Sequence, residues 1–363
     1  MDSLQKQSQH AIEFIRSAWP EAREAAKQAL KASEGKFEHV VLCGCGDSHH
    51  AALGLEMAFD VWTGLRARAA TAMTASRYLM PRSKLGASRT LLIGISASGE
   101  VARTLEAVEM GVSSGAHTLA LTGAADSALA RAAHMSLNLP VPSLPEGPGL
   151  LSFLSSLLMG LAVVHALAGE EDGDELEACM QDLPESLEVF FPEQSELGME
   201  FADEIDPAGA VVFLGCGPAY GMAKFAAAKL IEAAGMPAWG QDGEEWTHIE
   251  YFAEPAGVPT WLLSARGRSH GREEEIVAAA RAIDRNLRVS RWEGRPEWPS
   301  HAREALSTLA LWPGPVAFAS RMAARLGEKP FRDFGGGRSV QEGGGASRIR
   351  SSKRIRHPGE LES

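Results

Sequence analysis

Two apolar runs of this chain have the same form and begin 171 residues apart, at Val40 and Val211. Residues 40–46 read VVLCGCG and residues 211–217 read VVFLGCG, and an alanine-rich stretch with helical spacing follows each run. This pattern predicts a buried strand, a tight glycine turn and a helix. Free backbone N–H groups and the helix dipole meet at such a turn, so each copy can bind an anion. The sequence therefore predicts a duplicated α/β unit that handles phosphate.

Strand-like and helix-like segments alternate along both halves of the chain. Apolar runs at 89–96 and 117–123 continue the first half, and runs at 258–267 and 287–292 continue the second half. Helical patterns separate the strands of the first half. Alternation of this kind predicts an α/β fold with two tandem, doubly wound parallel-sheet domains.

The predicted organisation has five segments. Helical spacing precedes the first domain, and a helical linker interrupted by Pro184 and Pro192 joins the two domains. The last segment is rich in glycine and carries five basic residues between 348 and 356, which predicts a flexible basic tail. The segments are a helical N-terminal segment (1–35), a first domain (36–170), a linker (171–204), a second domain (205–326) and the tail (327–363).

Composition and charge narrow the class of protein. The chain has 363 residues, of which 45% are apolar and 23% charged, as in ordinary globular domains. The net charge of −12 argues against a nucleic-acid partner. The N-terminus has no basic region followed by an apolar core, and the apolar stretch 150–167 contains three serines and a histidine. These features predict a cytoplasmic protein with no membrane partner.

Two strand-ending loops of the first half combine glycines with hydroxyl groups. Residues 44–48 read GCGDS and residues 96–100 read SASGE. Serine hydroxyls and helix-start amides suit a phosphate monoester, although serines at these positions can also simply cap helices. No Gly-Lys-Ser/Thr follows, and His49 stands at the third glycine position of a dinucleotide fingerprint. A nucleotide is therefore not the first choice of ligand.

The GCGDS and SASGE loops resemble those of the sugar isomerase (SIS) domain family. The resemblance covers about residues 36–330 as two tandem, flavodoxin-like domains, in a layout similar to the isomerase half of the glucosamine-6-phosphate synthase family. It implies that Ser48, Ser96 and Ser98 bind the phosphate of a hexose 6-phosphate. The loop residues implied in this phosphate site are Cys45, Gly46, Asp47, Ser48, Ser96, Ala97, Ser98 and Gly99.

Two positions depart from the pattern of that family. Asp47 stands where threonine is common, and Val101 stands where a phosphate-binding threonine usually follows the acidic residue. A carboxylate repels a dianion unless it points away or binds a hydroxyl or an amine. His49 and His50 are weaker candidates for a role beside the loop, and surface helix positions explain them equally well.

Lys229 and Glu232 are three residues apart on a predicted helix that ends at Gly235, so they share a face. From the residues alone, an exposed ion pair explains them. In the SIS-type isomerase the resemblance implies another role: a Lys-x-x-Glu helix precedes a histidine by sixteen residues, the separation between Glu232 and His248. It implies that Glu232 moves a proton between C1 and C2 and that His248 opens the sugar ring. The family histidine comes from the partner subunit, which implies a homodimer.

The surroundings of His248 and of the C-terminus differ from the family pattern. Glu245 and His248 lie three apart in an acidic cluster, but no second histidine follows, so a solvated helix face is the simpler explanation than a metal site. The lysine that the synthase family carries near its C-terminus is expected at 335–338, which read GGGR. Lys353 can replace it only if the tail folds back.

The sequence thus predicts a cofactor-free, metal-free isomerase or deaminase–isomerase that acts on a phosphorylated sugar or amino sugar. Residue 2 is aspartate and no cysteine precedes Cys43, so no glutaminase nucleophile is expected in this chain. The alternative is a phosphosugar sensor without catalysis, which Val101 and the missing lysine favour. The absence of a recognisable output domain argues against the sensor.

Overall fold

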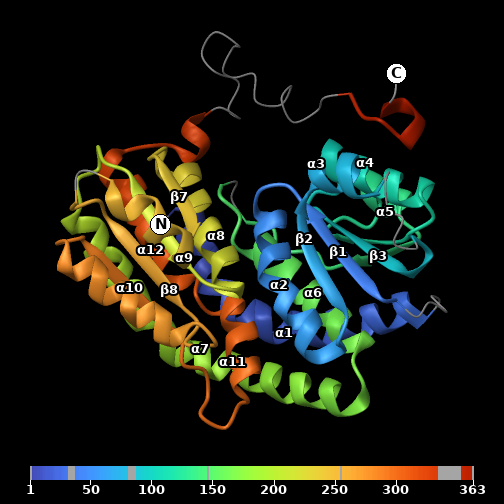
Figure 1. The fold of residues 1–363 in the computed structure, drawn as a ribbon, viewed down its shortest axis with the longest axis horizontal. Helices are drawn as coiled ribbons and strands as arrows, with labels where there is room; N and C mark the ends of the chain where they lie inside the picture. The colour runs from blue at the N-terminus through green and yellow to red at the C-terminus, as the bar shows by residue number, and fades with distance from the viewer. Residues whose placement is uncertain are drawn as a thin grey trace. The chain divides into compact units, whose positions relative to one another are not determined.

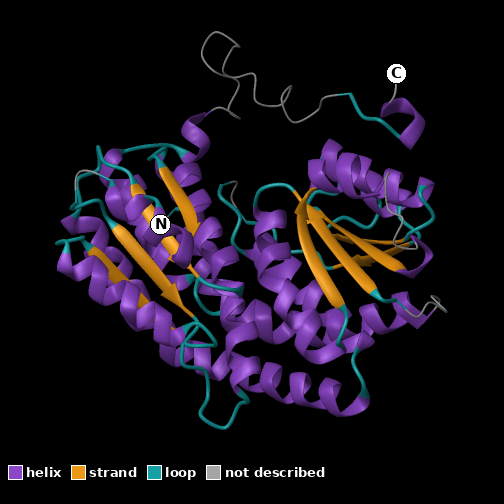
Figure 2. Ribbon diagram, viewed as in Figure 1, coloured by secondary structure: helices purple, strands orange, loops and turns teal. Residues whose placement is uncertain are grey.

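In a computed structural model of the chain, the described residues are 2–31, 37–80, 87–144, 147–253, 256–333 and 353–361. They contain two parallel sheets flanked by helices (Figures 1 and 2), which confirms the predicted α/β class. The chain divides into two compact units. The β1–β5 unit comprises Phe14–Pro142, Leu151–Met180 and Arg338–Ser363, and the β6–β9 unit comprises Met1–Glu13, Ser143–Leu150 and Gln181–Gly337.

The elements up to residue 167 include the whole five-stranded sheet. Its strands are β1 (His39–Gly44), β2 (Arg66–Thr71), β3 (Thr90–Ile95), β4 (His117–Thr122) and β5 (Met135–Asn138). The helical elements are α1 (Ser3–Lys31), α2 (Asp47–Thr63), α3 (Ala72–Thr74), η1 (Ala75–Leu79), η3 (Ala87–Arg89), α4 (Ala102–Ser113), α5 (Ala128–Ala132) and α6 (Leu151–Leu167).

The elements from residue 170 onward include the four-stranded sheet. Its strands are β6 (Val211–Gly215), β7 (Ala238–Asp242), β8 (Thr260–Ser264) and β9 (Leu287–Arg291). The helical elements are α7 (Glu170–Glu204), α8 (Pro218–Ala234), α9 (Gly243–His248), η4 (Glu250–Phe252), α10 (His270–Ala282), α11 (Ser300–Leu306), η5 (Ser307–Leu309), α12 (Pro313–Leu326), η6 (Pro330–Asp333) and η8 (Pro358–Leu361).

The five-stranded sheet has the order β2-β1-β3-β4-β5, and all its pairs are parallel. Helix α2 packs on one face with α6, whereas α4 covers the other face beside η1 (Figure 1). The chain leaves β1 toward β2 on one side and leaves β3 toward β4 on the other. In open parallel sheets, ligands bind beyond the carboxyl ends of strands at such a reversal. The topology therefore directs attention to the loops after β1 and β3.

The four-stranded sheet repeats this order as β7-β6-β8-β9, again with parallel pairs. One face carries Val212 and Leu214, which pack against α9 and α10. On the other face, Phe213 and Trp261 pack against aromatic rings of α7 and α12, with Phe318 at 5.7 Å from Trp261 between ring centroids. Aromatic burial of this kind contributes strongly to the stability of a unit.

The sequence pattern missed the edge strands β2 and β7. Alternate residues of β2 are exposed or only half-buried, and no residue of β7 is fully buried. An edge strand of this kind has no continuous apolar run by which to recognise it. The prediction that Pro184 and Pro192 interrupt the linker helix is wrong, because α7 continues through both. Each proline lacks a backbone N–H group, so one hydrogen bond of the helix is missing there, but the helix continues past it.

The last described segment, residues 353–361, is not a free tail. The Ile355 amide donates to the buried carboxylate of Glu106 at 2.9 Å, and the Ile355 side chain packs against the core beside α4. Arg354 pairs with Glu109 at 3.3 Å. The described part of the predicted tail therefore has defined contacts with the β1–β5 unit. The predicted lysine position, 335–338, lies outside the described residues.

Candidate functional site

The glycine turn after β1 leaves the start of α2 open. Gly46 has a φ of 56° and a ψ of −128°, a conformation that favours glycine, and no side chain caps the helix there. A Cβ on Gly44 would lie 2.5 Å from that of Ser48, so the first turn of α2 packs directly on Gly44. A Cβ on Gly46 would meet no atom of the described residues within 4 Å. The turn thus combines a helix N-terminus with open space beside it.

In the loop after β3, backbone amides of the loop donate hydrogen bonds to its two serine hydroxyls. The Gly99 amide donates to the hydroxyl of Ser96 at 3.1 Å, and the Glu100 amide donates to that of Ser98 at 3.3 Å. Ser96 is buried, whereas Ala97 and Ser98 are exposed. Each hydroxyl accepts a bond from the loop and retains a proton to donate. The loop can therefore present hydroxyl donors to an anion.

These two loops lie next to each other. Strands β1 and β3 pair directly, with Cys43 opposite Gly94. The Thr104 hydroxyl, in the first turn of α4, lies 4.0 Å from the sulfur of Cys45. Desolvation raises the pKa of the Cys45 thiol, against the effects of Thr104 and the Arg103 guanidinium. The structure thus brings together the predicted phosphate residues Cys45–Ser48 and Ser96–Gly99 at one edge of one sheet.

The two departures from the SIS pattern have clear surroundings. Asp47 directs Oδ1 toward Nδ1 of His50 at 3.6 Å, which is an ion pair only when the His50 imidazole is protonated. Val101 is the N-cap of α4, and no side chain caps that helix. The helix N-terminus that a threonine hydroxyl would cover therefore keeps its backbone donors for another acceptor.

Lys229 and Glu232 form an ion pair on α8, but the pair is not a surface feature. The Lys229 side chain is 0% exposed and that of Glu232 is 27% exposed. The Lys229 ammonium also donates to the carbonyl of Gly149 at 3.3 Å and lies 5.2 Å from the centre of the Phe225 ring. The interpretation as an exposed ion pair is wrong for Lys229, because residues 147–150 cover it. A buried ammonium that fixes a partly accessible carboxylate is an unusual arrangement.

His248 is not joined to this pair by the contacts of the structure. It ends α9, and its side chain is 68% exposed. Its Nε2 lies 3.1 Å from Glu244, which also binds Arg272. Hydrogen bonds from Arg272 and then from His248 hold the pKa of the Glu244 carboxyl below its usual range. His248 therefore belongs to an exposed cluster of charged side chains with Glu244 and Arg272, in the same β6–β9 unit as the Lys229–Glu232 pair.

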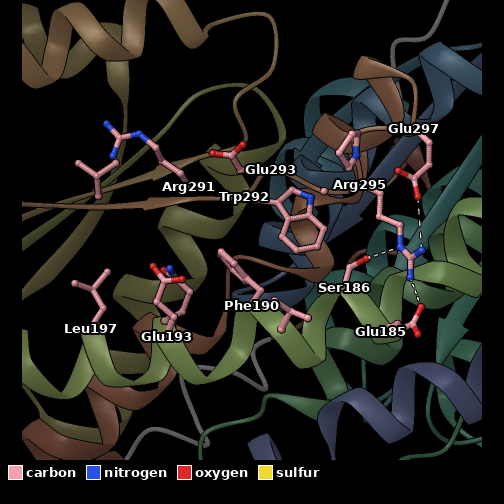
Figure 3. A pocket seen from close by; sticks show the side chains of 15 residues that line it. Glu185, Ser186, Phe190, Glu193, Leu197, Arg291, Trp292, Glu293, Arg295 and Glu297 are labelled. Carbon is pink, nitrogen blue, oxygen red and sulfur yellow. Dashed lines mark hydrogen bonds and ion pairs between the residues drawn. The ribbon is translucent and has the colours of Figure 1, made fainter.

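Other features of the described residues bear less on the site. They include no helix that is both long and apolar enough to cross a membrane, and no group of three potential metal ligands. Figure 3 shows a cleft of about 880 Å³ in the β6–β9 unit, between α7 and the segment after β9. Phe190 and Trp292 contribute adjacent rings to it, 5.1 Å apart. Its lining includes none of the predicted site residues.

Sequence reasoning missed a second loop pair in the β6–β9 unit. Cys43 and Leu214 are equivalent positions of the two repeated runs; Cys43 pairs with Gly94, and Leu214 pairs with Leu262. Two residues further along each neighbouring strand, Ser96 therefore corresponds to Ser264. The SASG of residues 96–99 then corresponds to the SARG of residues 264–267. Arginines in place of Ser98 and Glu100 conceal this repeat, although the shared Ser-Ala-x-Gly was a usable signal.

The fold places this chain among the α/β proteins with parallel sheets, with glycine and serine loops after two neighbouring strands. Comparison with known proteins narrows this class: residues 36–169 match the family described as SIS domain. The match spans 134 of the chain's 363 residues.

About two thirds of the chain is similar to part of a larger protein, and most of the chain is similar to solved structures. It is 26% identical to glutamine–fructose-6-phosphate aminotransferase (isomerizing) of Gloeobacter violaceus over 69% of this chain and 42% of the relative. The chain thus spans less than half the length of this relative. The C-terminal domain of glucosamine-fructose-6-phosphate aminotransferase from Francisella tularensis has the same fold, with a TM-score of 0.74, 15% identity and coverage of 90% and 96%. Glucosamine-6-phosphate deaminase from Thermotoga maritima also has this fold, with a TM-score of 0.60 and 18% identity; the match covers 88% of this chain and 97% of that one.

Proposed function

We propose that this chain is a phosphosugar isomerase or deaminase–isomerase that acts on a hexose 6-phosphate such as fructose 6-phosphate or glucosamine 6-phosphate. Ser48, Ser96 and Ser98 bind the phosphate together with the amides of the Gly46 turn. Glu232 transfers the proton between C1 and C2. The similarity to proteins named for these phosphosugars supports the substrate class.

The observation that carries the binding half of the proposal is the open turn at Gly46. A dianion needs several donors in one place, and the α2 N-terminus, the hydroxyl of Ser98 and the uncapped start of α4 supply them. A protonated His50 would reduce the repulsion between the Asp47 carboxylate and the phosphate.

The Lys229–Glu232 pair supports the catalytic half. Proton transfer at carbon needs a carboxylate held in one orientation at bonding distance from the C–H group. Lys229 supplies that restraint, since its ammonium is fixed by the Gly149 carbonyl as well as by Glu232. The Glu232 side chain is 27% exposed, unlike that of Lys229, so it is not sealed from solvent.

The proposed isomerisation of the open-chain sugar has two proton-transfer steps. A base removes the C2 proton of the open-chain aldose as its C1 oxygen gains a proton, which gives an enediol. Glu232, now protonated, returns the proton to C1, and the C2 hydroxyl loses its proton to give the ketose. An amino group at C2 gives an enolamine and then an imine, which water hydrolyses to the ketose and ammonia. We assign ring opening to His248, supplied by the partner subunit of a homodimer.

The test is direct incubation of the purified chain with each sugar phosphate. Wild type is expected to convert glucosamine 6-phosphate to fructose 6-phosphate with release of ammonia, or to interconvert glucose 6-phosphate and fructose 6-phosphate. Ser98→Ala is expected to raise the KM for the phosphosugar. Failure to bind any hexose 6-phosphate would rule out the proposal.

A sensor without catalysis is the second candidate. The absence of a capping hydroxyl at Val101 favours it, because one phosphate ligand of the family pattern is missing. Binding of a hexose phosphate without turnover, unchanged in Glu232→Gln, would identify the sensor.

A further inference from the structure

The β6–β9 unit contains a close structural copy of the open glycine turn. Gly217 caps α8 with a φ of 54° and a ψ of −130°, within a few degrees of the values for Gly46 at the start of α2. The backbone bonds correspond as well, since His49 donates to Gly46 at 2.9 Å and Tyr220 donates to Gly217 at 3.0 Å. Helix α8 has 17 residues, so its N-terminus carries a full helix dipole. Pro218 lacks an N–H group, so this turn offers one backbone donor fewer than the Gly46 turn, but the same backbone geometry.

The second loop of this copy is also present, after β8. Ser264 occupies the position of Ser96, and Arg266 and Arg268 follow it. The Arg266 amide donates to the Ser264 hydroxyl at 3.2 Å, much as Gly99 does to Ser96. Two guanidinium groups make this loop more cationic than its counterpart. An anion is therefore the ligand that the copy is built to hold.

A carboxylate of the chain itself already lies there. Glu304, from α11, is 4% exposed, and its Oε1 accepts a hydrogen bond from the Arg268 amide at 3.1 Å. The same oxygen lies 3.8 Å from where a Cβ on Gly217 would be. A Cβ on Gly267 would lie only 2.0 Å from the carboxyl carbon of Glu304, so that loop must pass the carboxylate as glycine. Glu304 thus binds the second loop of the copy and lies beside the Gly217 turn.

The remaining donor of the copy is taken by another internal carboxylate. The Ser264 hydroxyl donates to Glu273, which also accepts from Ser269 at 2.8 Å. Burial raises the pKa of the Glu304 carboxyl above its usual value; the Arg268 amide and guanidinium act in the opposite direction, and the charge of Glu273 adds slightly to the rise. At Gly46, by contrast, no described atom occupies the corresponding space.

We propose that the Gly217 turn and the Ser264–Arg268 loop form a second anion site, and that its resident ligand is the carboxylate of Glu304. The copy in the β6–β9 unit is therefore closed to external phosphate. Removal of the Glu304 side chain opens a cavity for a small carboxylate such as acetate or formate. The proposal rests on the geometry of this unit and holds whether or not the open turn at Gly46 binds a phosphosugar.

The test uses the full chain with the substitutions Glu304→Ala and Glu304→Gln. Sodium acetate is expected to raise the melting temperature of Glu304→Ala by about 3 °C or more beyond the effect of sodium chloride at equal ionic strength. Wild type and Glu304→Gln are expected to show no acetate-specific rise, because a side chain fills the site. Glu200→Gln, an exposed glutamate of α7, is the control.

Two results overturn the proposal. The first is an equal response of Glu304→Ala and wild type to acetate. The second applies even if Glu304→Ala does not fold: Glu304→Gln keeps the volume and an oxygen that accepts from the Arg268 amide, but it removes the negative charge beside the Arg268 guanidinium, so it is expected to melt below wild type. A Glu304→Gln protein as stable as wild type would show that the site does not select an anion.

Discussion

The Lys229 side chain is completely buried, yet its ammonium pairs with Glu232, whose side chain is partly exposed to solvent. A lysine loses much solvation when it is buried, and here the Gly149 carbonyl and the Phe225 ring offset only part of that loss. The buried Lys229 ammonium therefore restrains Glu232, while part of the Glu232 side chain is exposed to solvent. This asymmetry suits a proton carrier better than a structural salt bridge.

Lys229→Met is expected to lower kcat about 100-fold, because a misplaced base loses that much rate for about 1 Å of displacement. Methionine keeps an apolar stem of similar length, so the packing against Phe225 is retained. Lys224→Met removes a lysine of the same helix that lies 5.2 Å from the Tyr220 ring, and it serves as control. Steady-state kinetics on the phosphosugar would measure both. Equal kcat values for the two variants would remove Lys229 from the mechanism.

Gly46→Ala and Gly115→Ala separate backbone strain from ligand approach. Both glycines have positive φ, 56° and 81°, and neither would bring a Cβ within 4 Å of a described atom. Each substitution is expected to lower the free energy of unfolding by about 1 kcal/mol. Only Gly46→Ala is expected to weaken phosphosugar binding, by about tenfold or more, because its Cβ enters the space for the phosphate.

Calorimetric titration with fructose 6-phosphate and urea unfolding would measure these two effects separately. An equal loss of affinity in both variants would indicate a general effect of strain. No loss in either would place the phosphate elsewhere.

The Glu106 carboxylate predicts a dependence of stability on pH. Its side chain is 0% exposed. Burial acts to raise its pKa, but hydrogen bonds from Arg77, the Ile355 amide and Ser76, together with the charge of Arg103, lower it below 4.5 overall. A carboxyl with a lowered folded-state pKa stabilises the protein above its unfolded-state pKa, and this contribution is lost as pH falls through the folded-state value.

Urea unfolding between neutral pH and about pH 3 is therefore expected to show a decline for wild type below about pH 4.5. Glu106→Gln should be less stable than wild type at neutral pH and should decline less in acid. Glu109→Gln, on the same helix, is the matched control. Parallel pH profiles for wild type and Glu106→Gln would contradict this explanation.

Much of the fold follows from local patterns in the sequence. The VVLCGCG and VVFLGCG runs predict β1 and β6 correctly, because a fully buried strand followed by glycines has few other interpretations. β2 and β7 were missed because their edge positions leave polar residues in the pattern. α7 passes through Pro184 and Pro192, since packing along its length outweighs the local preference of proline.

The parts of the candidate site that are short sequence motifs could be predicted, whereas the contacts between residues far apart in the sequence could not. Gly44–Ser48 and Ser96–Gly99 are short motifs, and the strand order alone brings them together. The burial of Lys229 depends on Gly149, 80 residues away. Glu304 fills the second turn from a helix that no local pattern connects with it. Contacts of this kind appear only once the chain is folded.

The central claim is that Glu232 moves a carbon-bound proton of a phosphosugar, and exchange of that proton tests it most directly. Wild type incubated with fructose 6-phosphate or glucosamine 6-phosphate in deuterated water is expected to incorporate deuterium at C1 or C2, as seen by proton NMR. Glu232→Gln should bind the sugar with unchanged affinity but exchange at least about 100-fold more slowly. Undiminished exchange in Glu232→Gln would contradict the account.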